Sequence, residues 1–319
     1  MLTTPRRTLR LGGAAVVTVG LAAALAGCAP TPAAPSAGAP ATTTAAFEHI
    51  HGLGADLSTG ATYAGTHQGV WQIPTGLLPD SYLAGAPDAG LTRPTLSDGP
   101  AFDAMGFTVA GPGLLLASGH PGSDQSTLTG PNVGLISSTD AAASWTNVSL
   151  AGETDFHDLD AVPLPQEALR VFGYDSAAGT VSISDDDGAT WSTGASVALR
   201  DLAADPANPD RVFATTEDGL AVSDDAGRTF GPVSGAPMLY LIDVQDAAAG
   251  GGVVGIDPDG VVWRQEAGTW SRGGQTEGTP EALAFVGGGT PWLLAADQRG
   301  VVASDDFGLT WTVLVADQA

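Results

Sequence analysis

The sequence contains no lysine, a single cysteine (Cys28) and only five histidines among 319 residues. Its 11 basic residues, all of them arginine, stand against 35 acidic residues, which gives a formal net charge of −24. A surface with this charge repels nucleic acid and anionic lipid headgroups, so we expect no nucleic-acid partner and a preference for cations. A lone cysteine cannot form an internal disulfide, which excludes a disulfide-stabilised fold.

Residues 1–27 predict an export signal. Arg6, Arg7 and Arg10 precede an apolar stretch that is too short to span a membrane comfortably. The segment leads into the sequence LAGC, which resembles the lipobox of bacterial lipoproteins. This resemblance implies cleavage before Cys28, attachment of a diacylglycerol lipid to its sulfur, and an extracytoplasmic location on the cell membrane. The arginine pair also resembles a twin-arginine signal, and the sequence leaves both export routes, Tat and Sec, open.

The remaining chain divides into two parts. Residues 28–46 are rich in proline, alanine and threonine and carry no charge. Such a stretch cannot bury a core, so we expect an extended tether. Residues 47–319 are long enough to form one large all-β domain.

A short motif recurs along this domain. Its pattern is S-x-D-x-G-x-T-W, and an eroded copy ends at Trp270. The last residues of successive copies lie 39 to 46 residues apart. The aspartate carboxylate can accept hydrogen bonds from backbone N–H groups of a tight turn, and glycine allows a positive φ there. The aspartates of the four well-kept copies are Asp140, Asp186, Asp225 and Asp306.

These copies resemble the Asp-box, or BNR, repeat, and their even spacing resembles the Asp-box β-propellers. That group includes sialidases, sortilin-type receptors and proteins like photosystem assembly factors, and its members are often labelled glycosyl hydrolases. The resemblance covers almost all of residues 47–319 and implies that the four aspartates are structural turn residues. Short strands with Gly, Asp and Pro turns at this period predict six blades of four antiparallel strands, with seven blades less favoured. The six blades are expected to begin near Phe47, Ala104, Phe156, Leu199, Leu239 and Pro280.

All five histidines lie in the first half of the domain. Alignment of the repeats places histidines at the start of innermost strands and at the ends of second strands, positions that share one mouth of a propeller channel. Imidazole suits zinc and copper, and a nearby methionine thioether favours copper. The alternative is a set of hydrogen-bonded channel histidines without a ligand. We therefore predict a copper or zinc ion, with these candidate ligands: His49, His51, His67, Met105, His120 and His157.

The predicted function is a membrane-anchored metal-binding propeller without catalytic residues, although enzymatic activity stays open. One alternative is a glycoside hydrolase. Sialidases hold an anionic substrate with three arginines and use a tyrosine nucleophile, and here Arg200, Tyr240 and Glu281 are the candidates. Another glycosidase that uses two carboxylates also remains open. A further alternative is an interaction module for an envelope protein or a glycan, for which Trp71 and Tyr82 could provide the contact surface.

Overall fold

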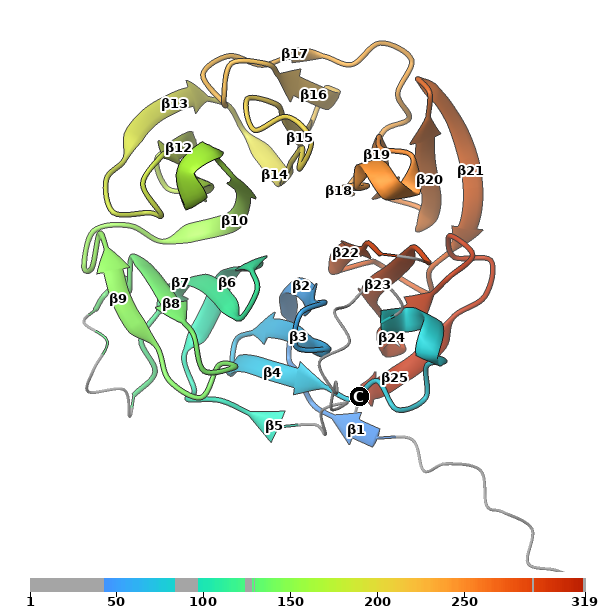
Figure 1. Ribbon diagram of the computed structural model, residues 1–319, viewed down its shortest axis with the longest axis horizontal. Helices are drawn as coiled ribbons and strands as arrows, with labels where there is room; N and C mark the ends of the chain where they lie inside the picture. Colours follow the sequence, from blue (N-terminus) through green and yellow to red (C-terminus); the bar gives the residue numbers. More distant parts are fainter. Residues whose placement is uncertain (1–42, 84–96, 124–127, 129, 289, 318–319) are drawn as a thin grey trace, which may run out of the picture. The chain divides into compact units, whose positions relative to one another are not determined.

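The computed structural model describes residues 43–83, 97–123, 128, 130–288 and 290–317. The predicted signal peptide, Cys28 and most of the predicted tether lie outside the described residues. Within the described part, no helix is both long and apolar enough to span a membrane. The unit that contains residues 43–317 forms six β-sheets arranged in a ring (Figure 1). The prediction of a six-bladed β-propeller is therefore confirmed.

In each blade, four strands that follow one another in the chain form an antiparallel sheet. The first three blades comprise β2 (Ile50–Asp56), β3 (Ala61–Thr66), β4 (Gly69–Ile73) and β5 (Ser97–Asp98), then β6 (Asp103–Gly111), β7 (Leu114–His120), β8 (Leu135–Ser138) and β9 (Thr146–Ser149), then β10 (Phe156–Pro163), β11 (Leu169–Asp175), β12 (Thr180–Ser184) and β13 (Ser192–Ser196). The last three comprise β14 (Leu199–Ala204), β15 (Val212–Thr216), β16 (Gly219–Ser223) and β17 (Gly231–Pro232), then β18 (Leu241–Val244), β19 (Val253–Ile256), β20 (Val261–Glu266) and β21 (Thr269–Gln275), then β22 (Ala282–Val286), β23 (Trp292–Asp297), β24 (Gly300–Ser304) and β25 (Thr312–Asp317). Short 3-10 helices are η1 (Asp80–Leu83), η2 (Pro165–Glu167) and η3 (Ala247–Ala249).

The two ends of the described chain meet on the last blade. Strand β1 (Thr43–Ala45), which falls within the predicted tether, pairs in parallel with β25 and adds a fifth strand to that sheet. The two strands lie side by side at the outer edge of the propeller (Figure 1). The chain thus closes the ring by placing its first strand on its last blade.

The four Asp boxes each join the third and fourth strands of a blade. In the last of them, the Asp306 carboxylate accepts hydrogen bonds from the Thr310 N–H (2.8 Å), the Thr310 hydroxyl (2.7 Å) and the Ser304 hydroxyl (2.8 Å). The Ser304 oxygen in turn accepts the Gly308 N–H at 2.8 Å, and Gly308 has φ +83°. The eroded fifth copy lacks the aspartate, and a two-residue turn at Ala267 and Gly268 with positive φ joins β20 to β21 instead.

The insertion after β4 belongs to the core. Tyr82 is 1% exposed, its ring packs edge-on against Trp292 of the last blade at 5.4 Å, and its hydroxyl is 2.7 Å from that of Thr62. Trp71 is partly buried against Phe47. The interpretation of Tyr82 as part of an exposed docking surface is therefore wrong, because its side chain fills the junction between the first and last blades.

Acidic side chains on the innermost strands, or directly before them, connect successive blades. Each places one carboxylate oxygen on a backbone N–H of the next inner strand, at 2.6 to 3.0 Å. Burial raises the pKa of several of these groups, to about 6 for Asp160, about 7 for Asp201 and about 8 for Asp243. The donor–acceptor pairs are Leu202–Asp158, Ala204–Asp160, Ile242–Asp201, Phe285–Asp243 and Ile50–Glu281.

Candidate metal site

Four successive blades carry a β-bulge at the start of the innermost strand. The strand register shifts there, and one residue in each blade has no partner on the second strand. A bulge bends its strand and re-aims the side chain of the extra residue. The four bulged residues are His51, Met105, His157 and Arg200, and all of them line one cavity of about 340 Å³. The bulges therefore direct these side chains into a common space.

A glycine follows the bulged residue in the first two blades because the next blade approaches closely there. A Cβ atom on Gly52 would lie 2.9 Å from the carbonyl oxygen of Phe107, and one on Gly106 would lie 2.6 Å from that of Phe156. These separations are too short for a side chain. The glycine beside His51 thus allows the second blade to pack against the strand that carries this histidine.

His49 is positioned by a strained turn. Its N–H donates to the Phe47 carbonyl at 2.6 Å, and the intervening Glu48 has φ +57°, the features of a γ-turn with a positive central φ. Such strain in a non-glycine residue is often found at functional sites. The imidazole Nδ1 lies 3.3 Å from a Glu281 oxygen, and its ring centroid lies 4.5 Å from that of His51.

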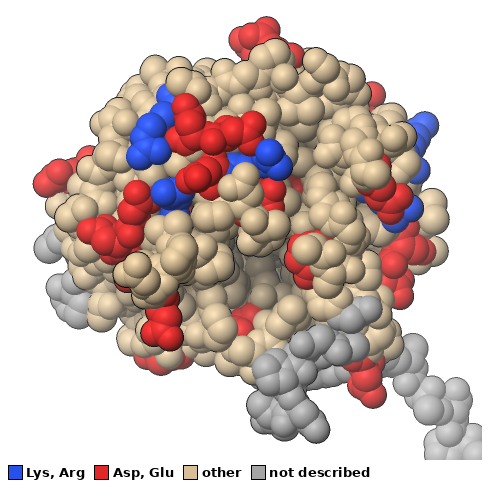
Figure 2. All heavy atoms as spheres, turned by 45° about the horizontal axis from the view of Figure 1, so that its top comes forward, with Lys and Arg blue, Asp and Glu red and all other residues tan. Residues whose placement is uncertain are grey.

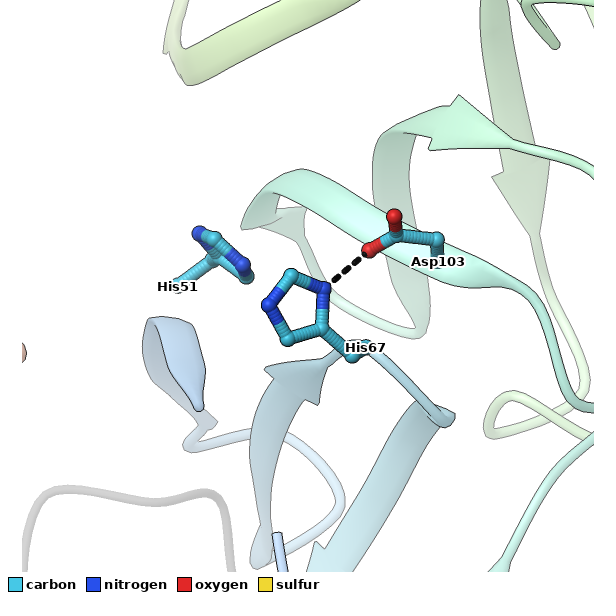
Figure 3. Close-up of side chains that lie close together, drawn as sticks. All are labelled: His51, His67 and Asp103. Atoms are coloured by element: carbon cyan, nitrogen blue, oxygen red, sulfur yellow. Dashed lines mark hydrogen bonds and ion pairs between the residues drawn. The ribbon is translucent and has the colours of Figure 1, made fainter. Parts of the chain in front are cut away.

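His51, His67 and Asp103 form the tightest group of ligating atoms (Figure 3). His67 lies in the turn between β3 and β4, and Asp103 is the first residue of β6. One nitrogen or oxygen atom from each of the three side chains lies within 4.8 Å of the others. His67 Nδ1 is 2.7 Å from Asp103 Oδ1, and because an ionised carboxylate only accepts, Nδ1 is the donor of this hydrogen bond. The second ring nitrogen of His67 faces His51 (Figure 3).

The environment of His51 keeps its imidazole neutral. Burial, together with the nearby His49 and His67, lowers the pKa of His51 from 6.5 to about 4. Its Nε2 atom is buried and has no hydrogen-bond partner within the described part of the chain. A neutral imidazole with an unused nitrogen is the form that binds a metal ion.

The other two histidines gather around a different carboxylate. Asp155 Oδ2 lies 2.9 Å from His157 Nε2 and 3.5 Å from His120 Nε2. The hydrogen bond to Asp155 raises the pKa of His157. His120 contacts both carboxylates, because its Nδ1 atom also lies 3.5 Å from Asp103 Oδ2. Of the candidate ligands in the described part of the chain, only His51 and His67 belong to a group of three side chains whose ligating atoms lie within 4.8 Å of one another, and Asp103 completes that group.

Sequence reasoning missed both carboxylates. Asp103 and Asp155 each stand two residues before a bulged residue, the position that His49 occupies in the first blade. The same repeat alignment, read two residues further upstream, could have found them. Met105 lines the cavity with the imidazoles, and its role as a ligand stays a prediction.

The candidate hydrolase residues lie at the same mouth but in two cavities. The Arg200 guanidinium stacks over the Tyr240 ring at 3.8 Å, and both line a neighbouring apolar cavity of about 470 Å³. Glu281 lines the histidine cavity with Arg200. Burial acts to raise the pKa of Glu281, but hydrogen bonds from His49 and from the Ile50 N–H lower it overall.

The surface of the propeller is acidic. Figure 2 shows one face of the propeller, hollowed near its centre, with acidic side chains spread over it and the basic ones lying beside acidic neighbours. This distribution follows from the excess of acidic residues in the sequence. Such a surface attracts cations and disfavours anionic ligands.

Among known proteins, no family model matches the chain. The chain is similar to a xyloglucanase. It is 28% identical over 233 residues to the xyloglucanase of Hypocrea jecorina (strain QM6a), an alignment that covers 64% of this chain and 26% of that protein. The chain thus spans about a quarter of the length of this curated relative. The resemblance to sialidases and sortilin-type receptors stays a prediction.

Several solved structures share the fold at low identity. They include a GH74 xyloglucanase from Xanthomonas campestris (TM-score 0.50, 19% identity, 83% of this chain and 38% of that one) and a gluconolactonase from the same organism (TM-score 0.58, 12% identity, 82% and 86%). A chain of a nidogen/laminin complex also matches, with TM-score 0.53, 13% identity and coverage of 77% and 88%. These likenesses establish the propeller architecture alone, because the fold serves unrelated functions.

Proposed function

We propose that this protein is a propeller that binds a divalent transition-metal ion at the mouth of its channel, through His51, His67 and Asp103. The observation that carries the proposal is the grouping of their ligating atoms within 4.8 Å around a neutral His51. Imidazole and carboxylate ligands suit copper and zinc, and copper(II) generally binds such sites more tightly than zinc. Three protein ligands leave an open coordination position for water or a second ligand.

The predicted lipid anchor gives this site a location. Cys28 and the uncharged tether would hold the propeller outside the cytoplasm, close to the membrane, where it meets extracellular metal ions. Replacement of Cys28 by serine in the full chain is expected to release the protein from the membrane fraction. Retention of the Cys28→Ser protein in that fraction would contradict the anchor.

Metal binding can be measured directly. The purified propeller is stripped with a chelator, loaded with copper(II) or zinc, desalted and analysed for bound metal. We expect the wild-type protein to bind metal and both His51→Ala and His67→Ala to lose the ion held by this group. Asp259→Asn serves as the matched control, because Asp259 is an exposed acid on a turn of the fifth blade. Metal content that is equally near zero in wild type and variants would refute the proposal.

Action on a glycan is the second candidate, and the similarity to a xyloglucanase favours it more than it favours metal binding. Glycosidases use an acid and a base, which are recognised as carboxyl groups whose pKa values are pushed apart. Asp201 and Glu281 line the histidine cavity together, and burial raises the pKa of Asp201 to about 7 whereas the pKa of Glu281 is lowered. In this candidate function Asp201 is the general acid that donates a proton, and the Glu281 carboxylate is the base.

Glycan activity is tested with xyloglucan oligosaccharides and nitrophenyl glycosides. Release of reducing ends or nitrophenol by the wild-type protein, abolished by Glu281→Gln and insensitive to chelator, would establish hydrolysis without metal. Electrophoretic retardation by xyloglucan without turnover would instead indicate a glycan-binding module. No turnover and no retardation would remove this candidate.

A further inference from the structure

An apolar cavity of about 470 Å³ lies where the fourth and fifth blades meet, beside the histidine cavity. Its volume is within the range of small-molecule sites in proteins. Neither the candidate metal group nor the carboxyl pair of the candidate hydrolase lines it. An apolar wall that is open to water gains free energy when the apolar surface of a ligand covers it. The wall consists of these residues: Ala198, Leu199, Met238, Leu239 and Pro258.

The Arg200 side chain lines this cavity and is held in place by an aromatic ring. A β-bulge aims the side chain, and its guanidinium stacks over the Tyr240 ring at 3.8 Å. The Tyr240 backbone is fixed, since its N–H donates to the Ile256 carbonyl at 2.7 Å and its carbonyl accepts the Thr215 hydroxyl at 3.3 Å. Stacking occupies a face of the guanidinium, and no group of the described residues accepts from the N–H groups at its edge. This edge can therefore bind a carboxylate through two parallel hydrogen bonds.

A charge of the opposite sign lines the cavity at the same end of the fourth blade. Leu199 and Thr216 are partners in the strand register, and Arg200 and Glu217 each follow one of them in the sequence. Both charged side chains are exposed, and both line the cavity. The Glu217 carboxylate, like the guanidinium, makes no ion pair or hydrogen bond with another described residue. The apolar wall is thus flanked by one cation and one anion.

These two charges select among ligands that have an apolar body. A ligand with only a carboxylate would pair with Arg200 but would face Glu217 and the acidic surface of the propeller. A ligand with only an amine would pair with Glu217 but would face Arg200. A molecule that carries both groups beside an apolar side chain complements both charges and has no net charge. An α-amino acid with an apolar side chain has this chemistry.

We propose that this cavity binds a free α-amino acid with an apolar side chain. The carboxylate of the amino acid accepts hydrogen bonds from Arg200, its ammonium group pairs with Glu217, and its side chain covers the apolar wall. This second ligand site goes beyond the proposed function, because no residue of the metal group lines it. It needs no metal ion, so the two proposals can be tested separately.

Isothermal titration calorimetry of the chelator-treated full chain with L-phenylalanine tests this inference. We expect binding to the wild type and to the control variants Arg272→Gln and Asp218→Asn, whose exposed side chains do not line the cavity. Arg200→Gln and Glu217→Gln should each weaken binding by roughly 10-fold to 100-fold, because each removes a charged hydrogen-bond partner.

Two analogues of phenylalanine separate the roles of the two charges. Hydrocinnamate lacks the ammonium group and should bind the wild type more weakly than phenylalanine, with no further loss in Glu217→Gln. Phenethylamine lacks the carboxylate and should also bind more weakly, with no further loss in Arg200→Gln. Hydrocinnamate that binds the wild type as tightly as phenylalanine would overturn the assignment, because the ligand would then be a simple carboxylate.

Other outcomes would also overturn this inference. They are the absence of binding of phenylalanine, leucine and methionine to the wild type, equal affinity of the wild type and Arg200→Gln, and an equal loss in Arg272→Gln. Metal content measured on the same proteins keeps the proposals apart, since metal binding without amino-acid binding refutes only this one. Circular dichroism establishes that each variant is folded, and Met238→Gln, which changes a side chain that is 50% exposed, should weaken binding through the apolar wall alone.

Discussion

At the scale of single residues, the imidazoles of this mouth are chemically different although they lie close together. His51 is buried among other imidazoles, whereas His157 is hydrogen-bonded to a carboxylate. The first environment disfavours the imidazolium ion and the second stabilises it. As the pH falls through 6.5, His157 therefore takes up its proton before His51, which stays available for a metal ion in mildly acidic solution.

Nuclear magnetic resonance titration of the imidazole protons checks this difference, and a chain with five histidines gives a simple spectrum. We expect His51 to titrate at about pH 4 and His157 above the ordinary value of 6.5. Asp155→Asn removes the charged acceptor, so the pKa of His157 should fall toward 6.5 while that of His51 stays low. A His51 resonance that titrates near 6.5 in the metal-free protein would contradict the burial of its ring.

The site was predictable from the sequence only in part, and the reason lies in residue frequency. His51, Met105 and His157 could be aligned because histidine and methionine are rare in this chain and stand at equivalent repeat positions. Asp103 and Asp155 stand at equivalent positions too, but with 35 acidic residues no single aspartate is conspicuous. The division of the histidines between two carboxylates depends on side-chain directions set by the bulges, which the spacing of residues does not reveal.

At the scale of elements, the Asp box is a turn held by one buried hydroxyl. Ser304 is 2% exposed and bonds both Asp306 and the Gly308 N–H. Its replacement by alanine leaves the buried Gly308 N–H without an acceptor, which should cost about 1–3 kcal/mol of unfolding free energy. Urea denaturation of Ser304→Ala measures this loss. The exposed Ser234 provides the control, since the unfolding free energy of Ser234→Ala should stay within about 0.5 kcal/mol of wild type. Equal stability of the two variants would show that the turn does not depend on the Ser304 hydroxyl.

The blades were predictable and the ring closure was not. The six blade starts followed from the period of the boxes and from the repeated strand pairs between them, because four blades share the same turn chemistry and all six share the strand pattern. Strand β1 has only three residues and lies in a Pro/Ala/Thr-rich stretch without a strand pattern. Its partner β25 is at the opposite end of the sequence, so no local signal indicates the pairing.

At the scale of the whole molecule, this closing strand should stabilise the ring. A chain that begins at Phe47 lacks β1 and leaves the edge of β25 unpaired. Loss of a few backbone hydrogen bonds, each with a net value of about 0.5–1.5 kcal/mol, predicts a decrease of roughly 1–4 kcal/mol in unfolding free energy. The exposed edge should also promote aggregation. Thermal unfolding and light scattering compare this chain with one that begins at Pro40, and equal stability would mean that β1 contributes nothing to closure.

The carboxyl groups that connect successive blades at the innermost strands form an inner ring. This inner ring gives the stability of the whole propeller an unusual dependence on pH. Asp243 links the last two blades through the Phe285 N–H, and burial together with the nearby Asp160 raises its pKa from 3.8 to about 8. Between these two values the folded protein holds a proton that the unfolded chain has lost. The contribution of Asp243 is therefore fully present below pH 3.8 and is lost as the pH rises toward 8.

Asp243→Asn tests this effect, because asparagine keeps an oxygen acceptor for the Phe285 N–H and carries no charge. Its amide nitrogen replaces the oxygen that accepts the Val244 N–H, and the cost of that loss does not change with pH. The variant should gain stability relative to wild type as the pH rises from 5 to 8, by up to about 1.4 kcal/mol per pH unit. Urea denaturation at several pH values measures the difference, and Asp259→Asn, an exposed acid on the same blade, should show almost none. If the difference between Asp243→Asn and wild type were constant across this range, Asp243 would be ionised throughout. The inner ring would then consist of charged acceptors, which could bind a cation but would not release protons.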